Sequence, residues 1–221
     1  MIKEFIKELN SLTEFEWCRY AFSNEPLSGK LNEDMRLTFF RGASEFGTSL
    51  AMSVKERMGQ MSIFEYAVRE GIKVNMEDAV FDGIYTMFAS FAHPDNITIY
   101  RNNARATDRM IEENGLSSIT GNVKTEDLLL AHELFHFYEN RMPDAYINQK
   151  HILLFKIGRF ENRSKLICLA EIAAMAFAGT LTELPCSPYL YDVLMLYSRN
   201  PQRGKQQYEQ IMKIAGVKEY D

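Results

Sequence analysis

Apolar residues recur at three- and four-residue spacing over two stretches near the start of the chain, residues 2–22 and 31–59. This period is typical of helices that bury one face. Two glycines in the second stretch, Gly42 and Gly47, predict a break there, because glycine weakens a helix interior. Residues 63–70 predict a further short helix. The first third of the chain is therefore expected to be helical.

The hydrophobic period then changes to one typical of strands. Residues 72–75 and 96–100 alternate apolar and polar side chains, as half-buried strands do. Between them, Asp82-Gly83 predicts a tight turn before a β-prone run, and Pro94 marks a second turn. These segments predict a small, mostly antiparallel sheet. The polar stretch from about 101 to 124 predicts no element, and the residues after it favour helix and loop, so the expected fold class is α+β.

Composition and charge narrow the possible functions. Hydrophobic residues make up 46% of the 221 residues and charged residues 25%, as in ordinary globular proteins. The net charge of −5 argues against binding to nucleic acid, which needs clustered Lys and Arg. The longest apolar stretch, Leu166–Leu181, is too short to span a membrane and carries Glu171, so no membrane contact is expected.

The cysteines and the first residues indicate a cytoplasmic protein. The three cysteines, Cys18, Cys168 and Cys186, are widely spaced and odd in number, which predicts reduced thiols. The first ten residues interleave charged and apolar side chains and do not resemble a secretion signal.

The strongest functional pattern is His132-Glu133-Leu-Phe-His136. We expect it on a helix with Thr125 as the N-cap, and two histidines four residues apart then lie one turn apart on the same face. Their imidazoles can reach one zinc ion at about 2.0–2.1 Å. Glu133, between them, can take a proton from a water polarised by the metal, and is the expected general base.

A third protein ligand is expected because catalytic zinc sites usually have three. The pattern that adds a third histidine on the same segment would need Gly at 139 and His at 142, and the chain has Glu139 and Met142. The best candidate is Glu171, the one charge between Lys165 and Glu183. A carboxylate buried in so apolar a segment needs a partner, and a divalent cation is a suitable one.

Other side chains remain alternatives as metal ligands. Glu139 is better placed for a hydrogen bond to a ligand than for the ion itself. His151 fits a helix start or a packed core position, and Cys168 fits a small buried residue. Two further carboxylates, Asp144 and Glu161, complete the set.

These motifs resemble the ImmA/IrrE-type metallopeptidases, which have a zincin-like fold. The resemblance covers about residues 63–185 and rests on Ile72-Lys-Val, Asp-Gly-Ile-Tyr85, Ile97-Thr-Ile-Tyr, Ala131-His-Glu-Leu-Phe-His and Glu171-Ile-Ala-Ala-Met-Ala-Phe-Ala. It implies Zn²⁺ at His132, His136 and Glu171, with Glu133 catalytic. It also implies a zincin-like core over residues 61–185. Outside the resemblance, we expect a helical N-terminal cap or regulatory region over 1–60 and C-terminal helices over 186–221 that pack on the core.

The resemblance implies a zinc metallopeptidase acting on an intracellular protein, such as a transcriptional repressor. Two departures, Phe135 where the family has Gly and Met175 where it has Asn, motivate an alternative: a metal-stabilised binding module without significant proteolysis. A third reading is a helical interaction protein without metal. Mn or Fe would also suit the ligands.

Two features of the reaction are expected but not assigned to one residue. The oxyanion formed during hydrolysis needs a donor, and the candidates are Tyr138, Arg159, Tyr189 and Tyr191. The segment 96–100 is expected to be an edge strand that pairs with an extended substrate.

Overall fold

The computed structural model describes residues 1–59, 61–79 and 86–217. The expected turn at Asp82-Gly83 lies outside these residues. The N-terminal helices are α1 (Ile2–Asn10), α2 (Glu14–Ala21), the short 3₁₀ helix η1 (Ser28–Lys30), α3 (Glu33–Met58) and α4 (Ile63–Arg69). The helical expectation for the first third of the chain is confirmed.

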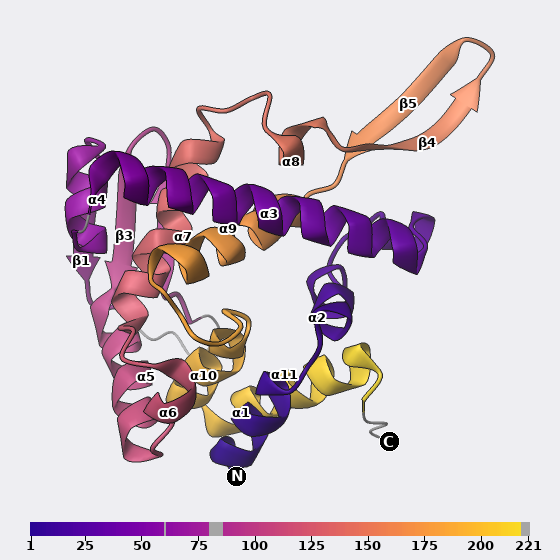
Figure 1. Cartoon of the computed structure of the whole chain (residues 1–221). Coiled ribbons are helices and arrows are strands. Elements are labelled where there is room, and N and C mark those ends of the chain that lie inside the picture. The colour runs from indigo at the N-terminus through magenta and orange to yellow at the C-terminus, as the bar shows by residue number, and fades with distance from the viewer. Residues whose placement is uncertain (60, 80–85, 218–221) are drawn as a thin grey trace.

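Helix α3 is continuous, so the expected break near Gly42 and Gly47 is wrong. The two glycines allow close approach instead of interrupting the helix. A Cβ at Gly47 would lie 2.1 Å from the backbone oxygen of Ala173, and one at Gly42 would lie 2.3 Å from the ring of Tyr146. The long α3 therefore packs directly along α9 (Cys168–Leu181), as Figure 1 shows.

The central sheet has three strands in the order β1-β3-β2. They are β1 (Lys73–Glu77), β2 (Ala89–Ala92) and β3 (Asn96–Tyr100). β3 pairs parallel with β1 and antiparallel with β2, so the sheet is mixed rather than mostly antiparallel. β3 lies in the centre, which makes the expectation that it is a substrate-binding edge wrong. Among the described strands, β1 and β2 form the two edges of this sheet.

The polar stretch after the sheet contains helices that the sequence analysis did not predict. They are α5 (Arg101–Glu113) and α6 (Ser117–Thr120). The buried face of α5 includes small or polar residues such as Ala104 and Thr107, with charged residues between them. The segment is therefore polar on average, and its hydrophobic period is weak. Met110 and Ile111 complete that face.

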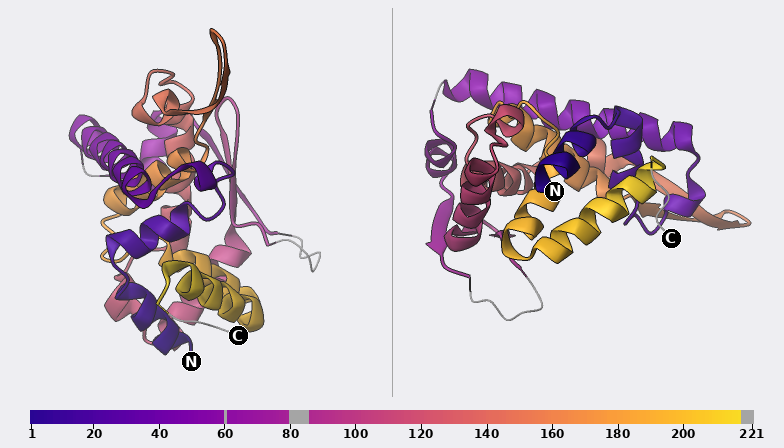
Figure 2. Two further views of the ribbon diagram at one scale, coloured as in Figure 1. Left: turned by 90° about the vertical axis from the view of Figure 1, so that its right-hand side faces the viewer. Right: turned by 90° about the horizontal axis from the view of Figure 1, so that it is seen from below.

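Helix α7 (Thr125–Glu139) packs against α9, β2 and β3, and further helices follow α7 in the chain. They are α8 (Tyr146–Gln149), α9, α10 (Leu190–Arg199) and α11 (Pro201–Ala215). One apolar core includes residues from α1 through α11. Helices α1 and α11, from opposite ends of the chain, lie side by side (Figures 1 and 2). No described helix has the length and apolar character required to cross a membrane.

A two-stranded hairpin projects from the body between α8 and α9 (Figures 1 and 2). It consists of β4 (His151–Ile157) and β5 (Phe160–Lys165), which pair antiparallel. The expectation of helix and loop in this region is wrong. The strand alternation was masked by a register irregularity between Leu153 and Phe155, which interrupts the two-residue period.

Candidate metal centre

Helix α7 begins beside a carboxylate from another helix. Asp108 on α5 accepts hydrogen bonds from the backbone N–H and Oγ1 of Thr125 at 2.9 and 2.6 Å. Thr125 is therefore the first helical residue, and the expectation that it is the N-cap is wrong. Asp108 provides the acceptor that an N-cap side chain would otherwise supply.

The rest of α7 separates an apolar face from a polar one. Leu130, Leu134 and Phe137 are at most 1% exposed and anchor the helix in the core. His132 and His136 lie one turn apart on another face, and their side chains are each 19% exposed. The expected placement of the two histidines is confirmed.

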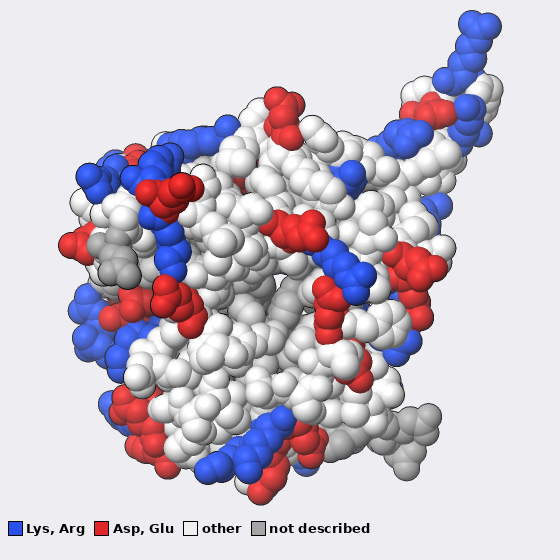
Figure 3. Space-filling model, in the orientation of Figure 1, with Lys and Arg blue, Asp and Glu red and all other residues white. Residues whose placement is uncertain are grey.

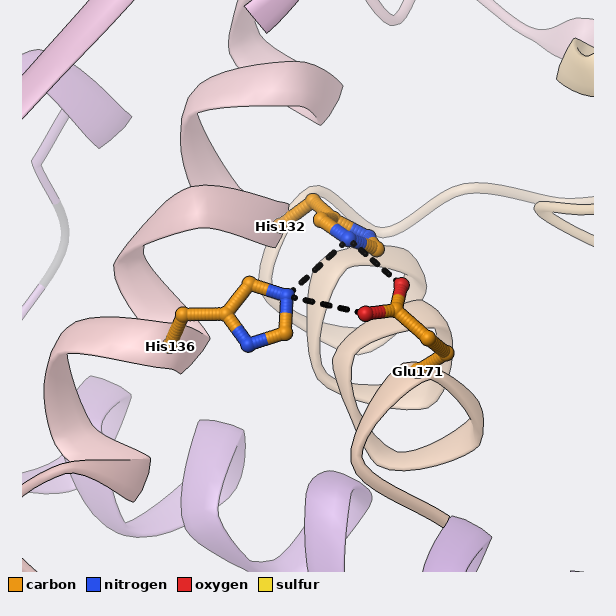
Figure 4. Close-up of side chains that lie close together, drawn as sticks. All are labelled: His132, His136 and Glu171. Carbon is orange, nitrogen blue, oxygen red and sulfur yellow. Dashed lines mark hydrogen bonds and ion pairs between the residues drawn. The ribbon is translucent and has the colours of Figure 1, made fainter. Parts of the chain in front are cut away.

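Helix α9 brings Glu171 to the same point. Its carboxylate oxygens lie 3.3 Å from Nε2 of His132 and 3.5 Å from Nε2 of His136 (Figure 4). The two Nε2 atoms are 3.3 Å apart. The side chain of Glu171 is 62% exposed, so the premise that this carboxylate is buried is wrong. Its partners are nevertheless the two histidines.

These three side chains fit a single metal ion. Ligand atoms held tetrahedrally at about 2.0–2.1 Å from zinc lie about 3.3–3.4 Å from one another. The two Nε2 atoms, at 3.3 Å, have that separation, and Glu171 lies beside both, with Oε2 at 3.3 Å from His132 Nε2 and Oε1 at 3.5 Å from His136 Nε2. Within the described part of the chain, His132, His136 and Glu171 are the group whose ligand atoms all lie within 4.8 Å. Two imidazoles and a carboxylate suit Zn²⁺ and also Mn or Fe.

The charges of these side chains shift their proton affinities. Burial by itself would lower the pKa of His132, but the carboxylates of Glu171, Glu133 and Asp192 together raise it. The hydrogen bond with His132 lowers the pKa of Glu171, against a smaller opposing effect of burial. The two shifts have the same origin, an ion pair that a divalent cation would replace.

Glu133 lines the same cavity as His132 and Glu171. Burial raises the pKa of its carboxyl above the usual range, and the nearby His132 and His136, with a smaller contribution from the backbone N–H of Phe91, partly offset this. A carboxylate with a raised pKa is a better proton acceptor near neutral pH. Its carboxyl therefore lies in the cavity beside His132 and Glu171, where a general base would have to lie.

A second carboxylate supports His136 from behind. Oε2 of Glu139 lies 3.1 Å from Nδ1 of His136, which leaves Nε2 free to face Glu171. Nζ of Lys165, at the end of β5, lies 3.6 Å from Oε1 of Glu139. Glu139 thus contacts His136, one of the expected ligands. Such contacts fix the tautomer and ring orientation of a ligating histidine.

The cavity at this centre has a volume of about 440 Å³ and contains a third acidic group, Asp192. Burial raises the pKa of Asp192 to about 6, against the effect of the hydrogen bond from Tyr20. The Tyr20 hydroxyl donates to Asp192 at 2.7 Å and accepts from Gln207 at 2.7 Å. Helix α10 thus lines the cavity through Asp192, and side chains of α2 and α11 support that residue from behind.

The open edge of β2 forms another wall. Tyr100 N–H donates to Phe88 O at 2.9 Å, and antiparallel pairs alternate between bonded and non-bonded positions. The backbone groups of Ala89 and Phe91 therefore point away from β3. Ala89 lines the cavity, and Phe91 N–H reaches Glu133.

The alternative ligands lie elsewhere. Asp144 is exposed in the loop before α8, and His151 is exposed at the start of β4. Glu161 pairs with Lys156 and Arg163 on the projecting hairpin. Cys168 is buried, with its backbone N–H bonded to Glu25. Its expected role as a small core residue is confirmed, whereas the expected packed position of His151 is wrong.

The four candidate oxyanion donors are dispersed. Tyr138 donates to Glu70 at 2.9 Å, and Arg159 lies at the turn of the hairpin. Tyr189 packs against Trp17 with ring centroids 5.5 Å apart. Tyr191 lines the cavity but is only 1% exposed. None of these contacts identifies an oxyanion donor.

The two departures from the family pattern have different surroundings. Phe135 is fully buried and packs against Phe46 and Phe177, so it fills the core on the side away from the cavity. Met175 lines the cavity itself. Phe135 therefore does not obstruct the cavity, whereas Met175 gives the cavity wall an apolar side chain in place of an amide.

Sequence reasoning missed three contributors to the site. Asp192 follows Tyr189 and Tyr191 in a segment that contains both polar and apolar residues. The one sequence signal for its burial is that its helical neighbours on the same face are apolar. Phe91 acts through its backbone, which carries no side-chain signal. Lys165 was noted only as the charge before an apolar run, and its link to Glu139 depends on the unpredicted hairpin.

Comparisons of this chain with models of known families, with curated proteins and with solved structures found no match.

Proposed function

We propose that this chain is a zinc-dependent metallopeptidase with a zincin-like core. The observation that carries the proposal is the convergence of His132, His136 and Glu171, whose ligand atoms all lie within 4.8 Å of one another. Glu133 lies in the same cavity, as the His-Glu-x-x-His pattern requires. The resemblance to ImmA/IrrE-type peptidases adds a substrate class, a protein such as a transcriptional repressor.

In the proposed mechanism the metal, when bound, acidifies water and polarises the scissile carbonyl. Glu133 takes the proton from the attacking water at its carboxylate and delivers it to the leaving amine. The Phe91 N–H holds that carboxylate in place. Glu139 orients His136, and the apolar cavity wall, including Leu128 and Met175, limits access of bulk water.

The open edge of β2 supports a peptide as the substrate. Backbone groups of Ala89 point away from β3 along the cavity that holds Glu133. An extended peptide can add to such an edge through main-chain hydrogen bonds, which places its backbone carbonyls in a row. A small-molecule substrate would make no use of this feature.

The test compares Glu133→Gln with Glu126→Gln on denatured casein and on a mixed library of quenched fluorescent peptides. Glu126 lies on the same helix two turns earlier, in its first turn. We expect Glu133→Gln to bind zinc as the natural protein does and to lose about 10²–10⁴-fold in hydrolysis rate. We expect Glu126→Gln to change little. Undiminished hydrolysis by Glu133→Gln would refute the mechanism.

The alternative function is a metal-stabilised binding module without useful turnover. Met175, which lines the cavity where the family has Asn, favours it. This alternative predicts that the zinc-loaded natural protein hydrolyses neither casein nor any peptide in the library, although it binds one zinc ion.

A further inference from the structure

The β4–β5 hairpin extends away from the body as an arm (Figure 1). Its strands pair with each other and with no third strand among the described residues. A two-stranded hairpin on its own is at best marginally stable in water. Large apolar side chains on the arm are nonetheless exposed, in contrast to the buried core of the body.

The pairing register gives the arm two different faces. Ile157 pairs with Phe160 and Phe155 pairs with Asn162, and alternate residues of a strand share a face. Phe155, Ile157 and Phe160 therefore lie on the same side, and the rings of the two phenylalanines are 6.1 Å apart. Lys156, paired with Glu161, lies on the other side.

The exposed apolar surface increases toward the tip. Leu153 is 40% exposed and Phe155 46%, whereas Phe160 and Ile157, beside the turn, are 62% and 71% exposed. Protein–protein interfaces usually place apolar groups at the centre and polar groups at the rim. On this hairpin the most exposed apolar side chains lie beside the turn, so the end of the hairpin is the part best suited to contact an apolar surface.

The arm and the body carry opposite charges. Residues 151–165 contain four cationic side chains and one carboxylate, a net charge of +3, whereas the remainder of the chain carries −8. Cationic side chains extend to the tip of the arm in Figure 3. Near an anionic surface the arm is attracted and the body repelled, so the charge distribution orients the molecule with its tip toward that surface.

We propose that the β4–β5 arm docks on an anionic membrane surface. Ile157 and Phe160 enter the boundary between headgroups and acyl chains, where apolar groups of peripheral proteins typically reach depths of roughly 5–10 Å. Lys156, Arg159 and Arg163 remain at the level of the lipid phosphates, because long cationic side chains keep their charged ends in the polar region. The expectation of no membrane contact considered only spanning helices, and a hairpin tip needs none.

A nucleic acid fits the arm less well. Glu161 pairs with both Lys156 and Arg163 at 2.7 and 3.1 Å, which reduces the positive charge available to phosphates. The most exposed apolar side chain, Ile157, is aliphatic and cannot stack on a base as an aromatic ring can. An aliphatic side chain can instead enter the apolar boundary of a lipid layer.

The test measures co-sedimentation of the full chain with vesicles of phosphatidylcholine alone and of phosphatidylcholine with phosphatidylglycerol at about 7:3, a composition with a negative surface potential. The arm variant is Ile157→Ser/Phe160→Ser. The matched control is Met52→Ser/Val68→Ser, which removes two apolar side chains exposed on the body to 61% and 53%. Circular dichroism melting verifies that each variant is folded.

We expect binding to the anionic vesicles that exceeds binding to neutral ones, about a tenfold lower partition coefficient for the arm variant and no change for the control. Added salt should weaken binding, because the cations contribute. Absence of binding by the natural chain, or equal binding by the arm variant, overturns the proposal. So does binding to single-stranded DNA without vesicle binding, or a dimer that the arm substitutions dissociate. Vesicle binding does not depend on peptidase activity.

Discussion

Each proposed metal ligand depends on neighbours that hold its side chain. Nδ1 of His136 contacts Glu139 at 3.1 Å, and Glu139 is approached in turn by Lys165 from the base of the hairpin. Among the described residues Glu171 has no such support and its side chain is 62% exposed, so its position depends on the histidines or on a bound ion. We therefore expect His136 to be pre-oriented and Glu171 to be ordered chiefly by the metal.

Removing the support of His136 should weaken metal binding. We expect Glu139→Ala to reduce zinc affinity by about 10–100-fold, because contacts of this kind set the orientation and basicity of a ligating imidazole. Lys165→Met should have a smaller effect, because it contacts Glu139 and not the histidine. Competition titration with a chromophoric chelator measures both. An unchanged dissociation constant for Glu139→Ala would contradict this role.

Asp192 should make the metal-free protein lose stability as pH rises. Burial raises its pKa to about 6 in the folded state, above the value near 3.9 of an unfolded chain. The folded state therefore binds more protons between these values, and the free energy of unfolding falls across about pH 4–6, by on the order of 2 kcal/mol. Urea denaturation of chelator-treated protein at several pH values measures this contribution.

The matched variant is Asp192→Asn, whose amide oxygen can still accept from the Tyr20 hydroxyl. We expect it to remove this fall and to be at least as stable as the natural protein at pH 7, because no charge is then buried. The same pH dependence in both proteins would show that Asp192 does not cause it.

At the scale of the elements, helix packing sets the position of the ligands. Helix α9 carries Glu171 and lies between α3 and α7. The contact of Gly47 with the backbone of Ala173 sets how closely α3 approaches α9. A side chain larger than hydrogen at position 47 would force α3 and α9 apart and so disturb the helix that carries Glu171.

Gly47→Ala should destabilise the fold although alanine favours helices. The added Cβ would lie 2.1 Å from the Ala173 oxygen, a backbone atom that cannot rotate away. We expect a loss of about 1–3 kcal/mol in the free energy of unfolding, typical of overpacked contacts. The control is Gly29→Ala, where nothing lies within 4 Å of the added Cβ. Chemical denaturation compares them, and equal stability would contradict the packing account.

The sequence predicted elements whose pattern is local and strong. Helices α4 and α7 and strand β3 follow from short-range periodicity, and the histidine pair follows from helix geometry. The β4–β5 hairpin was missed because a register irregularity interrupts its alternation, and α5 was missed because its buried face contains Ala104 and Thr107. The role of Phe91 could not be predicted, because a backbone N–H has no sequence signature.

At the scale of the whole molecule, both ends of the chain contribute to the site. Tyr20 from α2 and Gln207 from α11 form one hydrogen-bonded chain with Asp192 in the cavity. The N-terminal and C-terminal helices belong to the same apolar core as α7 and α9. Whether residues 1–60 act as a cap or a regulator stays a prediction, but contacts from this region reach the cavity wall.

The decisive measurement for the metal centre is a zinc titration of the natural protein, Glu171→Gln and Glu133→Gln, with metal content verified by mass spectrometry. We expect about one zinc ion per chain in the natural protein and in Glu133→Gln, and an affinity at least about 100-fold lower in Glu171→Gln, because a ligand is lost. Failure of the natural protein to bind zinc, or equal affinity in Glu171→Gln, would contradict the proposed three-ligand centre.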